Sequence, residues 1–125
     1  MTTVAQLVQA AKSQIDNLTP DQVEAEMAAA GITLVDVRDA PELADGTIRG
    51  AVHASRGMLE FYADPASPYH KAELAPQNRV ILYCASGGRS ALAAQSLREL
   101  GYVNVAHLDG GFKSWKAAGK PFLSQ

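Results

Sequence analysis

The sequence contains a single cysteine, Cys84, and three histidines scattered along its 125 residues. One cysteine cannot form an internal disulfide, and one cysteine with scattered histidines makes a poor zinc site. We therefore expect no metal, and nothing in the sequence points to a cofactor. A single reactive thiol is best kept reduced, which favours a cytoplasmic location.

Long apolar runs and clusters of like charge are also missing. No apolar run approaches the roughly 20 residues of a membrane span. The N-terminal segment MTTVAQLVQAAKSQIDNL lacks the basic start and the long apolar stretch of a signal peptide. The net charge is −2 and no Lys/Arg cluster stands out, so we expect neither a nucleic-acid partner nor a membrane partner.

The residues that are present have the composition of an ordinary soluble globular protein, with 47% hydrophobic and 19% charged residues. A chain of this length has room for one domain and one core, and it can bury about two-thirds of its surface. The sequence shows no internal repeat and no low-complexity tract.

Helix signals are clear near the N-terminus. Apolar residues recur with helical spacing from Val4 to Ile15, which predicts a helix with one apolar face. In LTPDQV, Thr19 fits the N-cap of a second helix and Gln22 fits the third position of a capping box. We expect that helix to end at Gly31.

The rest of the chain alternates strands with helices. We expect strands at 32–37, 51–54, 80–84 and 103–108, helices after 39, within 56–63, over 89–100 and within 110–119, and a surface connection at 64–79. The run VILYC at 80–84 is the most apolar strand, so it should lie at the centre of the sheet. This alternation predicts an α/β fold, a mostly parallel sheet covered by helices on both faces.

The position of Cys84 is the most informative feature. It stands at the end of the expected central strand, and ligands of open parallel sheets bind beyond the carboxyl ends of the strands. The following ASGGR segment can curl so that successive backbone N–H groups point inward and form an anion-binding nest. Gly87 and Gly88 supply the backbone angles that such a curl needs, with a positive φ expected at one of them at least.

The nest should make the thiol of Cys84 reactive. The N-terminus of the helix expected near Ser90 adds a partial positive charge, and Arg89 can add a full one, so the surroundings favour thiolate over thiol. The alternative is a cysteine buried for packing, which fits the middle of an apolar run better than its end. We therefore interpret Cys84 as a nucleophile.

These residues resemble the rhodanese family of sulfurtransferases. The match begins with CASGGRS after VILY, which is similar to the active-site loop of the family. LVDVRDAPE resembles a second family segment, carried here by Asp36, Arg38 and Glu42. GTIRGAVHAS resembles a third, with Thr47 where histidine is common and Ser55 where proline is common. GYVNVAHLDGGFKSWKAAGKP resembles the closing segment of the family.

The resemblance implies a rhodanese-like fold, a three-layer α/β/α arrangement with a mostly parallel central sheet of about five strands. The fifth strand is then expected near 17–19. The rhodanese domain would cover residues 17–125, preceded by an N-terminal helical extension at 1–16. The implied site consists of Cys84 as the catalytic residue and of the substrate-binding residues Ala85, Ser86, Gly87, Gly88 and Arg89.

The implied reaction is the transfer of sulfane sulfur. The thiolate of Cys84 would attack the outer sulfur of a small anionic donor, thiosulfate or a persulfide, and keep that sulfur as a persulfide. Cyanide, a small thiol or a partner protein would then accept it. This is covalent catalysis in two half-reactions.

Two other classes of function stay open. One is a persulfide carrier or protein-interaction module whose acceptor is another protein. The other is a cysteine-based phosphatase or arsenate reductase, whose related loops place five residues between cysteine and arginine. Here four residues separate Cys84 from Arg89, which favours a ring that fits a single sulfur over one that fits a phosphate.

Several further residues receive structural interpretations. We expect Arg38 to form an ion pair with Glu42 or with another carboxylate, and Asp36 to anchor neighbouring loops by hydrogen bonds. Gly110 and Gly111 predict a tight turn between strand and helix.

The remaining expectations concern the histidines and one long connection. His53, His70 and His107 are each expected at the surface or at a strand end, not as catalysts. In the segment 57–78, the side chains of Met58, Phe61 and Tyr62 either wall the pocket or form the buried face of a helix.

Overall fold

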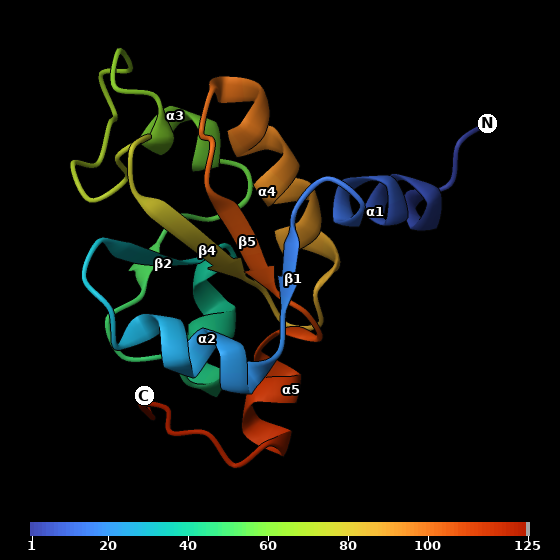
Figure 1. The fold of residues 1–125 in the computed structure, drawn as a ribbon, viewed down its shortest axis with the longest axis vertical. Coiled ribbons are helices and arrows are strands. Elements are labelled where there is room, and N and C mark those ends of the chain that lie inside the picture. Colours follow the sequence, from blue (N-terminus) through green and yellow to red (C-terminus); the bar gives the residue numbers. More distant parts are fainter. Residues whose placement is uncertain (125) are drawn as a thin grey trace.

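The computed structural model describes residues 1–124 as a three-layer α/β/α arrangement around one sheet (Figure 1). In chain order the elements are α1 (Val4–Lys12), β1 (Asp16–Leu18), α2 (Pro20–Met27), β2 (Ile32–Asp36), the 3-10 helix η1 (Ala40–Asp45), β3 (Val52–His53), α3 (Leu59–Ala63), β4 (Arg79–Tyr83), α4 (Gly88–Leu100), β5 (Val105–Leu108) and α5 (Gly111–Ala117). The expected fold class is confirmed.

The sheet has five strands in the order β1-β5-β4-β2-β3, and every neighbouring pair runs parallel. The apolar strand β4 lies at the centre, as its composition predicts. The fifth strand, β1, pairs with β5 through Asp16, Asn17 and Leu18, one residue earlier than expected. Whether the domain begins at residue 17, after an extension at 1–16, stays a prediction.

Side chains of β4 point alternately to the two faces of the sheet, and each face has its own core. On one face Val80 and Leu82 pack in a cluster with residues of α3 and α4, including Leu97. On the other face Ile81 and Tyr83 pack in a cluster with residues of α2 and α5. The central strand is therefore held on both sides, which fixes the position of the residue that follows it.

The start of α2 confirms the expected capping box. The Thr19 hydroxyl accepts the Gln22 N–H at 3.2 Å, and the Gln22 side chain accepts the Thr19 N–H at 2.9 Å. The helix ends at Met27, before the expected Gly31, because the chain turns at residues 28–30. Gly31 then leads into β2 with a φ of +81°.

Helix α1 differs from its prediction. It ends at Lys12, so Ile15 lies beyond it, and Ala11 is the one buried residue in the helix. Val4 and Leu7 are exposed because α1 packs mainly against α4 and projects from the body of the protein (Figure 1). None of the helices within residues 1–124 is long and apolar enough to cross a membrane.

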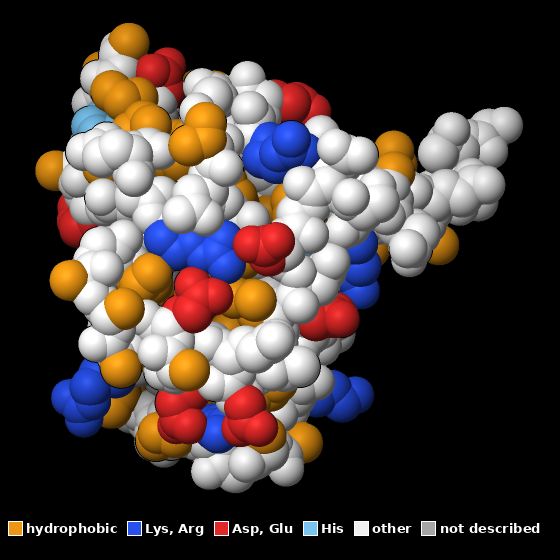
Figure 2. Space-filling view, viewed as in Figure 1, with side chains coloured by type: hydrophobic (Ala, Val, Ile, Leu, Met, Phe, Trp, Pro, Cys, Tyr) orange, Lys and Arg blue, Asp and Glu red, His pale blue; other side chains and the backbone are white. Residues whose placement is uncertain are grey.

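Several charged side chains on the face that carries α2 are paired. Figure 2 shows positive and negative groups next to one another on this face. Arg79 contacts Glu26 and Asp16, both at 2.9 Å. Lys120 contacts Asp21 at 2.6 Å and Glu24 at 2.8 Å. Pairing of this kind breaks up any continuous charged patch on this side of the molecule.

Candidate active site

Cys84 directly follows β4, and the next residues form a tight loop that leads into α4. The Sγ atom accepts the Gly87 N–H at 3.1 Å and the Ser90 N–H at 3.4 Å. Gly87 has a φ of +106°, so the expected positive φ is at this residue, while Gly88 is the first residue of α4. The helix begins two residues before the expected Ser90.

The loop presents further N–H groups that have no partner within residues 1–124, those of Ala85, Ser86, Gly88 and Arg89. They lie at the N-terminus of α4, a helix of 13 residues, where the aligned peptide dipoles carry a partial positive charge. Together with the N–H groups on Sγ, they make a site that can hold negative charge at or beside the sulfur.

The rear wall of the loop is the turn between β5 and α5. Gly110 and Gly111 have φ values of +79° and +65°, which confirms the tight turn. The N–H of Phe112 donates to the Cys84 carbonyl at 2.8 Å, and the N–H of Lys113 donates to the Ala85 carbonyl at 3.0 Å. A Cβ on Gly111 would lie 2.5 Å from the Ala85 carbonyl carbon, so the two backbones are in direct contact.

Arg89 does not leave its charge free beside the thiol. Its guanidinium donates to both carboxylate oxygens of Glu42, at 2.7 and 2.9 Å. Hydrogen bonding from Arg89 lowers the pKa of Glu42 to about 2, and the same pair raises the pKa of Arg89. Glu42 also accepts the N–H of Asp39, so one side chain joins the start of η1 to the start of α4.

This pair predicts a stability loss in acid. Because the pKa of Glu42 falls from 4.5 to about 2 on folding, its contribution is present above about pH 4.5 and is lost as the pH falls toward 2. We expect Glu42→Gln to be less stable than the wild type at pH 6 and to lose less stability between pH 5 and 2. Thermal unfolding across that range measures this, and parallel pH profiles for the two proteins would contradict it.

Arg38 forms its ion pair with Asp36 and not with the carboxylate of Glu42. Both side chains are buried, and the guanidinium donates to Asp36 through Nε at 3.0 Å and Nη2 at 2.8 Å. Nη2 also donates to the Gly46 carbonyl at 2.7 Å. The Asp36 carboxylate in addition accepts the Arg38 backbone N–H at 3.0 Å. The structural interpretation of both residues is confirmed.

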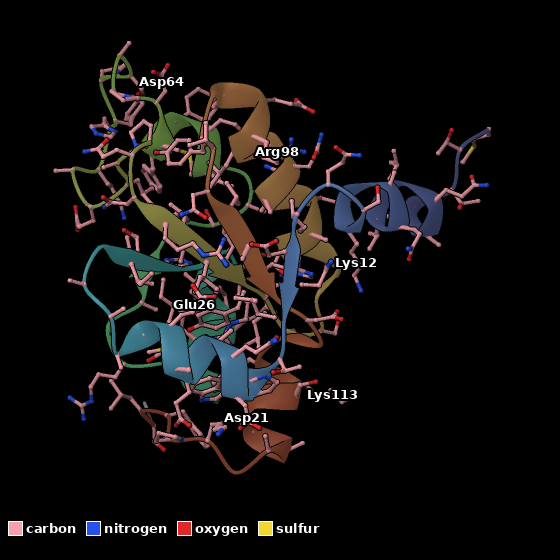
Figure 3. The ribbon with its side chains drawn as sticks, viewed as in Figure 1. Lys12, Asp21, Glu26, Asp64, Arg98 and Lys113 are labelled. Carbon is pink, nitrogen blue, oxygen red and sulfur yellow. The ribbon has the colours of Figure 1, made fainter. Side chains whose placement is uncertain are left out.

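A cavity of about 420 Å³ lies beside the loop. Its lining combines loop, η1 and α5 residues: Arg38, Glu42, Asp45, Ala85, Ser86, Phe112, Lys113 and Lys116. Lys116 pairs with Asp45 at 2.9 Å, whereas Lys113 has no ion-pair partner within residues 1–124. Figure 3 places Lys113 on α5. A small anion next to Ser86 therefore meets one unpaired positive side chain.

The segment 57–78 does not wall this cavity. Leu59 and Ala63 are the buried residues of α3, while Phe61 is exposed and packs edge-on against Tyr69. Tyr62 packs at the margin of the core cluster under α4. Met58 and Phe61 neither wall the pocket nor form the buried face of a helix. The short helix α3 instead packs against the core through Leu59 and Ala63.

The prediction for His107 is wrong in one respect. This residue is fully buried in β5, and its Nδ1 lies 2.8 Å from the hydroxyl of Ser90. Ser90 is in turn 3.5 Å from Cys84 Sγ. His53 and His70 are partly buried and contact backbone carbonyls. The sequence gives no signal for the contact of His107 with Ser90, because the two residues lie 17 positions apart, in β5 and α4.

The two glycines of the loop should respond differently to substitution. A Cβ on Gly87 would lie 3.1 Å from the Gly110 N atom at a φ that costs about 1–3 kcal/mol for an L side chain. A Cβ on Gly88 meets nothing nearer than Val8 at 4.0 Å. We expect the Gly87→Ala substitution to turn the amide of residue 87 away from the sulfur. The rate of reaction at Cys84 should then fall about a hundredfold.

Gly88→Ala is the matched control for that substitution. It adds the same methyl group one residue later. We expect this variant to retain the stability of the wild type and most of the rate of reaction at Cys84. Thermal unfolding and turnover measured on both variants make the comparison. Equal losses in the two variants would show that the positive φ of Gly87 is not what holds the loop in shape.

Comparison with known proteins identifies the group to which this fold and loop belong. Residues 19–118 match the rhodanese-like domain family. The chain belongs to the rhodanese family. It is similar to thiosulfate sulfurtransferase GlpE from Coxiella burnetii, with 35% identity over 69% of this chain and 73% of that protein. A protein named sulfurtransferase from Allochromatium vinosum is 31% identical over 74% of this chain and 79% of its own length.

Solved structures agree with a rhodanese domain. The polysulfide-sulfur transferase homodimer from Wolinella succinogenes matches with a TM-score of 0.77 and 33% identity, covering 95% of this chain and 85% of that one. A protein of unknown function from Rhodopseudomonas palustris, described as a possible tyrosine phosphatase, matches with a TM-score of 0.92 and 39% identity, covering 98% and 95% of the two chains. The chain is thus a member of a sulfurtransferase family.

Proposed function

We propose that this rhodanese is a thiosulfate-type sulfurtransferase with Cys84 as its nucleophile. The observation that carries the proposal is the position of Cys84 directly after the central strand, where its sulfur accepts the N–H groups of Gly87 and Ser90. Such donors stabilise a thiolate and, after reaction, the negative charge of a persulfide.

The donor is a small anion that carries a sulfane sulfur, either thiosulfate or a persulfide. Its outer sulfur meets Cys84 while its anionic end occupies the cavity beside Ser86, near the unpaired Lys113. A bond forms between Cys84 Sγ and the outer sulfur, and the sulfur–sulfur bond of the donor breaks. The electron pair of that bond leaves with sulfite when the donor is thiosulfate, and with a thiolate when the donor is a persulfide. Cyanide, a small thiol or the thiol of a partner protein takes the outer sulfur in the second half-reaction.

Phosphatase chemistry is the second candidate, because of the description given to the relative from Rhodopseudomonas palustris. Two features of this chain count against it. Only four residues separate Cys84 from Arg89, and the Arg89 guanidinium is held by both oxygens of Glu42 instead of being free for a phosphate.

Mass spectrometry of the intact protein tests the proposal. After treatment with thiosulfate we expect a mass gain of one sulfur atom on Cys84, and its loss on addition of cyanide or a thiol. The same protein should release no phosphate from an aryl phosphate. An unchanged mass after treatment with both thiosulfate and an inorganic polysulfide, or turnover of the aryl phosphate, would overturn the proposal.

A further inference from the structure

A chain of hydrogen bonds runs from the thiol of Cys84 to the surface through buried side chains. Sγ lies 3.5 Å from the Ser90 hydroxyl, which lies 2.8 Å from His107 Nδ1. His107 Nε2 lies 2.8 Å from Asn17 Oδ1. The chain therefore joins α4, β5 and β1, and it begins at the atom that reacts.

The direction of these hydrogen bonds follows from Asn17. Its Nδ2 donates to the carbonyls of Lys12 at 2.9 Å and Ile15 at 3.3 Å, which points the amide oxygen at His107. An amide oxygen only accepts, so His107 Nε2 carries a hydrogen and, in the neutral ring, Nδ1 is an acceptor.

Ser90 completes the assignment. Its single hydroxyl hydrogen can go to His107 Nδ1 at 2.8 Å or to the Gly87 carbonyl at 3.4 Å, and the shorter contact to nitrogen is the stronger one. The lone pairs of the Ser90 oxygen then face Cys84 and accept the S–H of the thiol. Every hydrogen in the chain thus points away from the sulfur.

The surroundings keep the ring of His107 neutral, which leaves Nδ1 free to accept a hydrogen bond from Ser90. Burial lowers the pKa of His107 to about 4, so the ring is neutral at neutral pH when the thiol is protonated. The charged groups that face it are Asp109, which raises this pKa, and Lys12, which lowers it. These two form an ion pair at 3.0 Å, and Figure 3 shows Lys12 at the end of α1, beside β1.

We propose that Ser90 and His107 form a relay that takes up the thiol proton of Cys84 during its attack. As sulfur bonds to an electrophile, its proton passes to the Ser90 oxygen while the Ser90 proton passes to His107 Nδ1. The positive charge on His107 arises as negative charge develops on sulfur, so the two charges offset each other in the buried site. His107 acts through Ser90 and does not touch the substrate.

The relay runs in reverse when the outer sulfur leaves. In the second half-reaction Cys84 departs as a thiolate, and the proton held on His107 returns to it through Ser90. This use in sulfur transfer rests on the proposed function. The uptake of the thiol proton does not, because it accompanies the attack of Cys84 on any electrophile.

Alkylation by iodoacetamide tests the relay without any sulfur donor. A carbon–sulfur bond forms, iodide leaves with the electron pair, and the thiol proton goes to the relay. We expect the wild type at about pH 6 to be alkylated at least about tenfold faster than Ser90→Ala and His107→Phe. At about pH 10 direct loss of the thiol proton to hydroxide should bring the three rates together.

Two further variants make the test independent of folding defects in His107→Phe. Asn17→Ala removes the acceptor of the Nε2 hydrogen at an exposed position, and we expect a smaller loss at about pH 6 with the same convergence in base. His70→Phe removes a histidine outside the chain and should follow the wild type at every pH.

The outcomes separate the relay from a merely structural hydrogen bond. A structural role predicts that Ser90→Ala and His107→Phe change the rate by one constant factor at all pH values, and that result overturns the proposal. The proposal is also overturned if Asn17→Ala and His107→Phe are alkylated at the wild-type rate at about pH 6. A different outcome is an alkylation rate of the variants that falls at low pH in a protein that takes no sulfur from thiosulfate or polysulfide. That result would support the relay and contradict the proposed sulfur chemistry.

Discussion

Replacing Cys84 with serine lowers cyanide-dependent thiocyanate formation from thiosulfate by about 10⁴-fold or more, which is the largest effect that we expect from any single substitution. In the proposed reaction the thiol of Cys84 carries the transferred sulfur, and a hydroxyl is too weak a nucleophile to replace it. Since Cys84 is the single cysteine of the chain, no second thiol can take over its role.

The fold should survive this substitution. Serine is close to cysteine in shape, and its oxygen can accept the same N–H groups of Gly87 and Ser90. Thermal unfolding of Cys84→Ser within a few degrees of the wild type is the control. Appreciable thiocyanate formation by the folded variant would show that another group carries the sulfur.

Arg38→Met should cause the largest loss of stability, about 3–5 kcal/mol, because it leaves the buried carboxylate of Asp36 without its partner. The variant also removes the donor to the Gly46 carbonyl and the guanidinium that lies 4.6 Å from the centre of the Phe112 ring. Urea unfolding followed by tryptophan fluorescence measures the difference, since Trp115 is buried in the same cluster as Phe112.

Arg56→Met is the matched control for Arg38→Met. Arg56 also pairs with a carboxylate, Glu60 at 3.1 Å, but both side chains are partly exposed, and such pairs contribute about 0–1 kcal/mol. A second test is Asp36→Asn combined with Arg38→Met, which should recover part of the loss. Equal unfolding midpoints for Arg38→Met and Arg56→Met would contradict a role for burial.

Local signals account for the features of the fold that the sequence predicts. The capping box at Thr19 and the uninterrupted apolar run of β4 act over a few residues, so they can be found by spacing alone. The short strand β1 carries almost no such signal. Two of its three residues are exposed, and it was expected only from the family resemblance.

The candidate site also contains some residues whose placement the sequence predicts and others whose contacts it does not. The loop from Cys84 to Arg89 is contiguous, and its glycines indicate its curvature before the structure is known. The partner of Arg89 could not be found by spacing, because Glu42 lies 47 residues away. His107 was missed for the same reason, since its contact with Ser90 spans 17 residues and two elements.

The order of the strands has a consequence for synthesis of the protein. The first strand pairs with the last, and the contact between Asn17 and His107 joins residues 90 positions apart. The wall behind Cys84 comes from residues 110–113, which leave the ribosome after the thiol does. Contacts of such separation form late in folding. A nascent chain that has not yet exposed residues 107–113 therefore lacks both the side-chain partner of Ser90 and the wall behind Cys84.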